Sequence, residues 1–496
     1  MKILTSRISA IVFMLVLFIA SAQAQDRKLP VETAITTNHE VTIKGQRVPY
    51  TATAGTQPVW DENGDPIASL FYTYYERTDI SDNTKRPLVI SFNGGPGSAS
   101  IWMHLAYTGP KVLNIDDEGY PIQPYGFKDN PHSILDVADI VFVDPVNTGY
   151  SRITGEDVSR NTFFGVNEDI KYLSDWVNTF VTRQDRWASP KYLIGESYGT
   201  TRVSGMALQL QNAHWMYLNG VILVSPTGLG IDRSGPVAAA NYLPYYAATA
   251  WYHKVLPADL QAKDLDEILP EVEQYTLDVV IPAITRGGSL DPAKRREIAT
   301  QMARYSGLKV EVILQHNLAV PTGFFWKELL RDQGLTIGRL DSRYRGIDAM
   351  DAGSGRDYDP ALTSWNHSFA PAMNMYAKQV LKFDTDLTYN LFGPVNPWNR
   401  NGDNTGENLR QAMLQNPYMH VMNQSGYYDG GTDYFNAKYN LWQINSNGKL
   451  GDRLRFEGYR SGHMMYLRAE DLKNANDHVR DFIQKSMVAE GIPAKY

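Results

Sequence analysis

GESYG, at residues 195–199, lies between a short apolar run at residues 192–194 and the helical pattern of residues 200–210. A G-x-S-x-G turn between a buried strand and a helix exposes its serine at a sharp bend. Glycines flank the serine because such a tight turn leaves no room for β-carbons. The N-terminus of the helix adds backbone N–H groups where negative charge can develop. The stretch therefore predicts that Ser197 is a nucleophile; the alternative is an ordinary glycine-rich connection.

A second glycine-rich loop, NGGPG at residues 93–97, follows the apolar run LVISF at residues 88–92. A serine nucleophile in such a turn needs a second backbone N–H, which a loop earlier in the chain supplies. A Gly-Gly pair lets the main chain approach a substrate closely, whereas Pro96 has no N–H to offer. We therefore predict an oxyanion hole made of the amides of Gly95 and Tyr198. The alternative is a plain glycine-proline turn after a strand.

Together the two motifs resemble the signature pair of the serine carboxypeptidases, which are α/β-hydrolases. Residues 140–151 (IVFVDPVNTGYS) are similar to a further strand and loop of that family, with Asn147 in place of a glycine. Residues 462–464 (GHM) resemble the family's segment around its catalytic histidine. The resemblance spans most of the chain. It implies an α/β-hydrolase fold, with a central, mostly parallel sheet and a helical cap insertion, in an exported member of bacterial type.

The catalytic acid is expected after a late strand, since hydrolases of this fold place their groups in the order serine, acid, histidine. Residues 418–422 form a short apolar segment that leads into a polar loop ending at Asp429. Family members commonly have Gly-Asp-x-Asp here, and the resemblance makes the second aspartate, Asp429 in this chain, the catalytic one. Asp433 is the fallback, although capping of the next helix explains that residue better.

The catalytic histidine is expected in a loop beyond the acid. Residues 453–456 are predicted to form the last strand, and His463 follows within one short loop, 34 residues beyond Asp429. The other histidines have ordinary surface or packing explanations. In the predicted mechanism His463 takes the proton of Ser197, while Asp429 orients the imidazole ring. Ser197 attacks a carbonyl, and water later hydrolyses the acyl-enzyme.

Recognition of the substrate's terminal carboxylate is implied only by the resemblance. It assigns this role to Asn93 and Glu196, and a glutamate can accept a second carboxylate beside it only if the two share a proton. Fourteen residues after the motif asparagine the family usually carries a second glutamate, but this chain has Tyr107 there, with the following Gly109-Pro110 preserved. Tyr107 either donates its hydroxyl to the substrate carboxylate or marks a changed specificity.

Residues 1–24 are predicted to be a signal peptide. Lys2 and Arg7 form a basic start, residues 8–20 an apolar core and residues 22–24 a small-x-small cleavage site. The apolar stretch is too short for a comfortable membrane span, and the alternative is an N-terminal anchor. The chain has no cysteine, whereas many members of the resembled family carry disulfides. We expect an exported protein, periplasmic or secreted, and the missing cysteines favour a bacterial envelope protein.

The charge and motif content exclude several other classes of function. The formal net charge is −7, and it becomes −9 once Lys2 and Arg7 leave with the signal peptide. A mild acidic balance without a basic run argues against nucleic acid or an anionic membrane as partner. The sequence has no metal-ligand spacing such as H-E-x-x-H and no phosphate-binding glycine loop. We therefore predict no metal and no cofactor.

The spacing of the motifs predicts one catalytic domain interrupted by an insertion. Ser197 and Asp429 are 232 residues apart, far more than an α/β-hydrolase core needs. Residues 230–376 are helical and aromatic in pattern and are predicted to form a cap. The core is then split into residues 25–229 and residues 377–496. The cap's aromatic residues either line a substrate pocket or, as we rather expect, pack in the cap's own core.

The leading hypothesis is an exported serine carboxypeptidase that acts on peptides with a free C-terminus. The nearest alternative keeps the same triad but acts as an esterase or acyltransferase, and Tyr107 favours it. A third possibility, from another class, is a catalytically silent peptide-binding protein. Peptides with blocked and free C-termini separate the first two, and labelling of Ser197 by an organophosphonate excludes the third.

Overall fold

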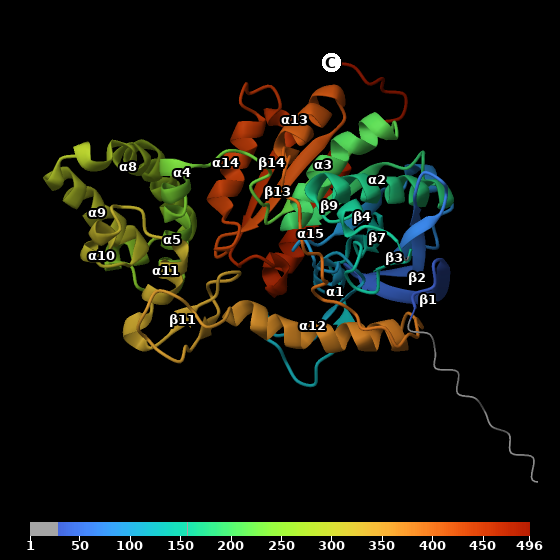
Figure 1. The fold of residues 1–496 in the computed structure, drawn as a ribbon, viewed down its shortest axis with the longest axis horizontal. Helices are drawn as coiled ribbons and strands as arrows, with labels where there is room; N and C mark the ends of the chain where they lie inside the picture. Colours follow the sequence, from blue (N-terminus) through green and yellow to red (C-terminus); the bar gives the residue numbers. More distant parts are fainter. Residues whose placement is uncertain (1–27, 156) are drawn as a thin grey trace, which may run out of the picture.

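A ten-stranded sheet organises the computed structural model, which describes residues 28–155 and 157–496. The strand order is β1-β2-β3-β7-β4-β9-β10-β13-β14, with the short β8 paired to β3 (Figure 1). The strands are β1 (Thr33–Ile43), β2 (Gln46–Trp60), β3 (Pro66–Arg77), β4 (Leu88–Phe92), β7 (Asp139–Val143), β8 (Arg152–Ile153), β9 (Lys191–Glu196), β10 (Gly220–Val224), β13 (His420–Gly426) and β14 (Leu454–Tyr459). The predicted signal peptide lies outside the described residues.

The sheet is parallel from β7 to β14 and antiparallel only at its N-terminal side. β7, β4, β9, β10, β13 and β14 pair in parallel, whereas β1, β2, β3 and β7 pair antiparallel. The apolar runs of β4, β7 and β10 are buried along their whole length, as parallel strands covered on both faces require. The predicted α/β fold class with a mostly parallel sheet is confirmed.

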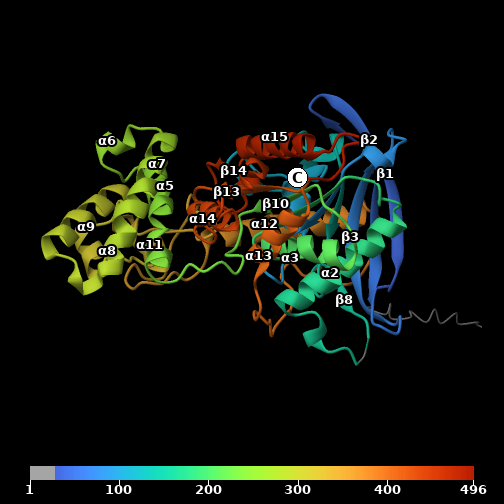
Figure 2. The same ribbon diagram turned by 90° about the horizontal axis from the view of Figure 1, so that it is seen from above.

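Helices cover both faces of this sheet, and successive side chains of β4 pack against different groups of helices on the two faces. Leu88 and Ile90 pack with α2, α3 and α13, whereas Val89 packs in the cluster that contains α1, α12 and α15. In Figure 2 α15 lies on one side of the strands, with α2 and α3 on the other. These helices are α1 (Ile101–Ala106), α2 (Val166–Arg183), α3 (Tyr198–Ala213), α12 (Pro360–Gln379), α13 (Thr405–Gln415) and α15 (Ala469–Ser486).

A separate helical lobe is inserted between β10 and α12 (Figures 1 and 2). It has its own hydrophobic cluster, which reaches from Ala240 to Ile337. Its elements are α4 (Gly235–Ala240), α5 (Leu243–Tyr252), α6 (Ala258–Gln261), α7 (Leu265–Tyr275), α8 (Ile281–Arg286), α9 (Pro292–Ser306), α10 (Val310–Gln315), α11 (Thr322–Glu328) and the small hairpin of β11 (Thr336–Ile337) and β12 (Arg345–Gly346). The predicted insertion, residues 230–376, also includes most of α12, which packs in the sheet's own cluster instead.

Asn147 illustrates how one replacement within a family-like loop is tolerated. Its φ is 66°, in the left-handed region that glycine adopts freely. Asparagine enters this region more readily than other residues with a side chain, because its short polar group bonds locally. The loop after β7 therefore keeps its turn although a glycine is replaced.

Candidate active site

Ser197 occupies the sharp turn between β9 and α3. Its backbone has φ 57° and ψ −125°, a conformation that a residue with a side chain adopts only under strain. The Ser197 N–H donates to the carbonyl of Val224 at 2.9 Å, which ties the turn to β10. A β-carbon on Gly195 would overlap the Gly199 carbonyl, and one on Gly199 would lie 2.7 Å from the Phe92 carbonyl. Both flanking positions therefore require glycine, because a β-carbon there would clash with neighbouring backbone atoms.

The loop of residues 93–97 lies directly against this turn. A β-carbon on Gly94 would overlap the amide nitrogen of Tyr198 and lie 2.6 Å from the Glu196 carbonyl. Gly95 follows with φ 101° and lines the same cavity as Ser197. Within the described residues, neither the Gly95 amide nor the Tyr198 amide donates a hydrogen bond to a protein acceptor. Both amides are thus free to bind an oxyanion.

Asp429 and His463 come together because the strands before them are neighbours. Asp429 follows β13 and His463 follows β14, and parallel strands end at the same edge of a sheet. The distance between His463 Nδ1 and Asp429 Oδ2 is 2.7 Å. The His463 amide donates to the Leu340 carbonyl at 2.7 Å, so the loop between β11 and β12 of the helical lobe also holds the histidine.

Thr432 completes this arrangement, and the sequence analysis missed it. Its hydroxyl lies 2.7 Å from Asp429 Oδ2 and 3.1 Å from His463 Nδ1. The Gly431 and Thr432 amides donate to Asp429 Oδ1 at 2.8 and 3.1 Å. The fallback acid, Asp433, instead accepts from the Asn436 amide at 2.9 Å and caps α14 (Tyr434–Ile444). A threonine three residues after an aspartate was the available signal, but it is too common to single out.

The pKa values of the pair shift in the directions that a catalytic histidine and its carboxylate require. Burial acts to raise the pKa of Asp429, but His463 and the hydrogen bonds from Thr432 outweigh it and lower that pKa. Burial acts to lower the pKa of His463, but the charge and hydrogen bond of Asp429 outweigh it and raise that pKa. Asp429 therefore stays ionised and stabilises the imidazolium that forms when the ring takes a proton.

Glu196, next to the nucleophile, is 2% exposed and titrates near neutrality. Burial raises its pKa to about 7, while His463 and the Tyr466 hydroxyl act in the opposite direction. Tyr466 donates its hydroxyl directly to Glu196 Oε2. The side chain of Asn93 faces Glu196 and also acts to lower its pKa, although its buried amide nitrogen makes no hydrogen bond of normal geometry. Tyr466 was not predicted, because it follows the histidine motif with no pattern of its own.

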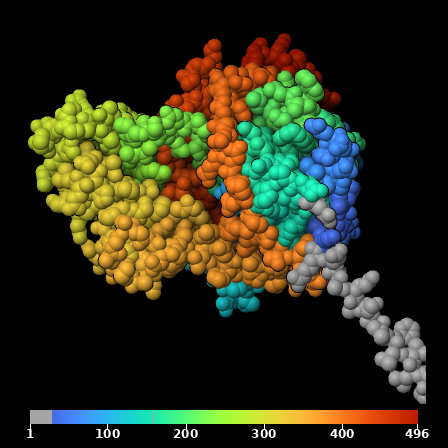
Figure 3. Space-filling model, viewed as in Figure 1, coloured from blue at the N-terminus to red at the C-terminus, as the bar shows by residue number. Residues whose placement is uncertain are grey.

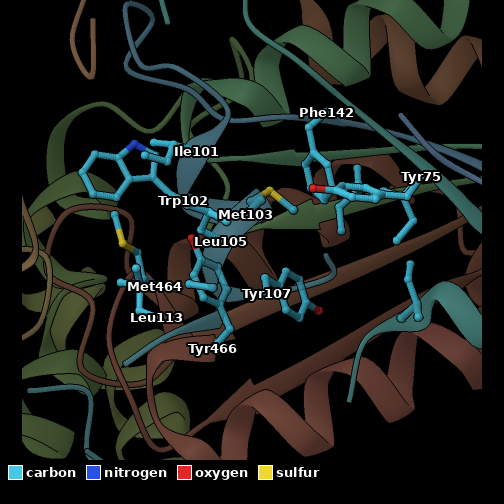
Figure 4. Packing of buried hydrophobic residues seen from close by; sticks show 14 of the residues in the cluster. Tyr75, Ile101, Trp102, Met103, Leu105, Tyr107, Leu113, Phe142, Met464 and Tyr466 are labelled. Atoms are coloured by element: carbon cyan, nitrogen blue, oxygen red, sulfur yellow. The ribbon is translucent and has the colours of Figure 1, made fainter. Parts of the chain in front are cut away.

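Tyr107 lies behind this cluster and not in the cavity. It is fully buried, and its hydroxyl donates to Gln424 Oε1 at 2.6 Å. Its ring stacks on Tyr466 with 4.8 Å between ring centroids, as the neighbouring rings in Figure 4 show. The Tyr107 hydroxyl is thus engaged by Gln424, and Tyr107 is not among the residues that line the cavity. Tyr107 instead supports the ring of Tyr466.

A cavity of about 400 Å³ is lined by four of the site residues that the sequence predicted. Ser197, His463, Glu196 and Gly95 line it, together with side chains that the sequence did not predict. The other lining residues include Pro96, Trp102, Arg339, Leu340, Leu362, Phe392, Trp398, Arg400 and Met464. Figure 3 shows the surface hollowed between the yellow-green helical lobe and an orange segment near residue 400. Asp429 and Asn93 lie just beneath the lining, both fully buried.

The aromatic residues of α5 do not reach this cavity. Tyr245 and Tyr246 belong to the hydrophobic cluster of the helical lobe, and the rings of Tyr246 and Phe325 stack at 4.0 Å. They therefore stabilise the lobe itself. Across the described residues, no group of three or more histidine, aspartate or glutamate side chains is arranged to hold a metal ion.

Comparison with known proteins points to one family. Residues 46–276 match the family model of the serine carboxypeptidases. A putative serine carboxypeptidase-like protein of Arabidopsis thaliana is 26% identical over 41% of this chain and 39% of its own length. Serine carboxypeptidase S10 family member 1 of Dictyostelium discoideum is 28% identical over 42% of this chain and 46% of its own length. The matched segments thus span less than half of these relatives.

A solved structure extends the likeness to the whole fold. The crystal structure of KEX1, a prohormone-processing carboxypeptidase from Saccharomyces cerevisiae, aligns over 90% of this chain and 93% of its own, with a TM-score of 0.51 and 17% identity. The family match contains Ser197, Glu196 and Asn93, whereas Asp429 and His463 lie beyond it. The fold is what brings these two residues to the same edge of the sheet.

Proposed function

Because the chain belongs to the serine carboxypeptidase family, we propose that it is an exported serine-type carboxypeptidase that releases C-terminal residues from peptides. The observation that carries this proposal is the geometry at the end of β14. His463 lies 2.7 Å from Asp429 and lines one cavity with Ser197 and Glu196. A base held by its orienting acid and a strained serine then face the same cavity.

In the proposed reaction His463 accepts the proton of Ser197 as its Oγ attacks the scissile carbonyl. The Gly95 and Tyr198 amides hold the oxyanion of the tetrahedral intermediate. The imidazolium of His463 then protonates the leaving amine, and the same histidine activates the water that hydrolyses the acyl-enzyme. Asp429, held by two backbone amides and by Thr432, keeps the ring in the required tautomer.

We assign recognition of the terminal carboxylate to Glu196 and Asn93. With a pKa of about 7, Glu196 is largely protonated in mildly acidic solution and can donate to an ionised carboxylate. The Asn93 amide nitrogen, buried and without a partner, can donate as well. A buried donor left unpaired costs free energy, so a substrate carboxylate that accepts from it is favoured.

The alternative function is an esterase or acyltransferase with the same triad. The observation that favours it is the orientation of Tyr107, which stands where the family has its second glutamate but donates its hydroxyl to Gln424 and does not line the cavity. In that case the carboxylate site would be incomplete, and the enzyme would not distinguish a free C-terminus from a blocked one.

One comparison of substrates tests these two proposals. An N-blocked dipeptide with a free C-terminus and its C-terminal amide are assayed from pH 4 to 8, with Ser197→Ala as control. For a carboxypeptidase we expect a kcat/KM at least about 100-fold higher for the free acid, since the amide replaces one carboxylate oxygen by an N–H₂ group and leaves one of the two buried donors, Glu196 or Asn93, without an acceptor. The preference should grow toward acidic pH. Equal cleavage of acid and amide would favour the esterase.

Tyr466→Phe is predicted to shift the pH profile of this reaction upward. Tyr466 stabilises ionised Glu196, so losing its hydroxyl raises the pKa of Glu196. Because protonated Glu196 binds the substrate, kcat/KM falls as pH rises through this pKa, and that fall should occur at a higher pH in the variant. His463, Asp429 and Asn93, which also face Glu196, are unchanged. The profile of kcat/KM against pH for the free acid measures the shift.

Tyr107→Phe is the matched control for this experiment. It removes a buried hydroxyl from the neighbouring ring, but that hydroxyl serves Gln424 and not Glu196. In the profile of kcat/KM against pH, the fall on the alkaline side should occur at the same pH in this variant as in the wild type. An alkaline limb that stays unmoved in Tyr466→Phe would contradict the role assigned to Glu196.

We further propose that residues 1–24 direct export to the periplasm or the medium of a bacterial cell, and that the helical lobe, residues 235–346, acts as the cap. Within residues 28–155 and 157–496, the helices fall short of the length and apolar character that crossing a membrane requires. The lobe borders the cavity through the loop that carries Arg339 and Leu340.

A further inference from the structure

Two arginines line the active-site cavity of an otherwise acidic protein. Arg339 and Arg400 contribute to its wall, and Glu196 is the only carboxylate among the described residues that line it. The chain as a whole carries a net charge of −7. Since Glu196 has a pKa of about 7, its charge is largely absent in mildly acidic solution. The cavity then presents an excess of positive charge to whatever enters it.

Arg339 makes only a long ion pair, with no side-chain hydrogen bond, to its nearest carboxylate. Its Nε lies 3.9 Å from Asp359 Oδ2, and its side chain is 48% exposed. The oxygens of Asp359 already accept from the backbone amides of Arg339, Leu340 and Ala361, at 3.2 to 3.3 Å. The hydrogen bonds of Asp359 thus stabilise this loop and the start of α12. The Arg339 guanidinium keeps most of its hydrogen-bonding capacity for a ligand.

Arg339 also lies close to the catalytic groups. Its carbonyl accepts from the Gly430 amide at 2.8 Å, and the next carbonyl, of Leu340, accepts from the His463 amide at 2.7 Å. A β-carbon on Gly431 would lie 3.9 Å from Cζ of Arg339. The positive charge of Arg339 acts to lower the pKa of His463, against the larger effect of Asp429. The guanidinium therefore lies near His463 and the loop that carries Asp429.

Arg400 belongs to a different wall of the same cavity. It follows Trp398, which also lines the cavity and packs edge-on against Tyr198 with 5.3 Å between ring centroids. Its side chain is exposed, and within the described part of the chain it has no carboxylate within 4 Å. The two arginines thus come from segments about 60 residues apart, and only the folded molecule brings them to the same cavity.

We propose that Arg339, assisted by Arg400, makes this enzyme selective for peptides with an acidic side chain next to the scissile bond. The inference rests on the proposed carboxypeptidase function and names its substrate class. A guanidinium binds a carboxylate through two parallel hydrogen bonds. The terminal carboxylate remains with Glu196 and Asn93, so the arginines serve the side chain of one of the two flanking residues.

The test uses matched pairs of N-blocked dipeptides with free C-termini. Each pair differs only in Glu against Gln, placed either before the scissile bond or at the C-terminal position. At pH 5.5 and low salt we expect wild-type kcat/KM to favour Glu by about tenfold in at least one position, the effect of a hydrogen bond to a charged group. The preference should shrink as salt rises, because the arginines are partly exposed. No preference for Glu in either position would overturn the proposal.

Three variants locate the effect in the cavity. Arg339→Gln should abolish the preference for Glu, and Arg400→Gln should reduce it. Arg345→Gln, which removes an exposed arginine of the same region that does not line the cavity, should leave the preference unchanged. Retention of the preference in Arg339→Gln would overturn the assignment.

The same assay separates this inference from the proposed function. Free acid and amide are compared for each variant. If Arg339→Gln keeps the preference for a free C-terminus and loses only the preference for Glu, both proposals stand. Loss of the free-acid preference would instead make Arg339 the anchor of the terminal carboxylate and overturn the inference. A wild-type protein that cleaves no peptide would contradict the proposed function itself.

Discussion

Replacing Ser197 with alanine is expected to lower kcat for peptide hydrolysis by about 10⁶-fold. The reason is chemical, because without Oγ no acyl-enzyme forms and His463 has no proton to accept. What activity remains should come from the oxyanion hole and from substrate binding, roughly 10³- to 10⁴-fold above the uncatalysed rate. Hydrolysis of an N-blocked dipeptide with a free C-terminus measures the loss, and an organophosphonate should label wild type but not the variant.

Ser204→Ala is the matched control for the nucleophile. Ser204 lies on the same helix, α3, and is fully buried with a hydroxyl that has no hydrogen-bond partner. Its loss should leave kcat within a few-fold of wild type and cost little stability, because no bond is broken. Equal activity of Ser197→Ala and wild type, with both proteins folded by their melting temperatures, would contradict the assigned role of Ser197.

Asp429→Asn should lower kcat by about 10⁴-fold at neutral pH. The asparagine can turn its N–H₂ group toward His463 Nδ1, which stabilises the tautomer with its proton on the wrong nitrogen. The negative charge that raises the pKa of His463 is lost as well, so the ring becomes a weaker base. The Gly431 and Thr432 amides can still donate to the remaining oxygen, which keeps the loop in place. Steady-state kinetics on the free-acid dipeptide measures the effect.

Asp433→Asn tests the competing choice of acid in the same loop. Asparagine is as good an N-cap as aspartate, so α14 should keep its start and kcat should stay within a few-fold of wild type. The reverse pattern, with Asp433→Asn nearly inactive and Asp429→Asn active, would transfer the role of acid to Asp433. Stability of both variants by thermal unfolding separates a catalytic loss from a failure to fold.

The strand-turn-helix around Ser197 could be predicted because its causes are local. The apolar run of β9, the flanking glycines and the following helix are neighbours in sequence, and so are NGGPG and the strand before it. The order of serine, acid and histidine follows from the order of parallel strands whose ends meet at one edge. The choice of Asp429 over Asp433 rested on the family resemblance, and contacts of Thr432 and Asn436 now give it a physical basis to be tested.

The chain by itself thus determined the fold class and the residues that a local turn or a strand end must present. Tertiary structure alone decided which distant side chains meet. Tyr466 donates to Glu196 across 270 residues, Tyr107 donates to Gln424 across 317, and Arg339 reaches the cavity from the hairpin of the helical lobe. The physical reason is that a hydroxyl or guanidinium takes whichever partner packing leaves within reach, and packing is a property of the whole fold.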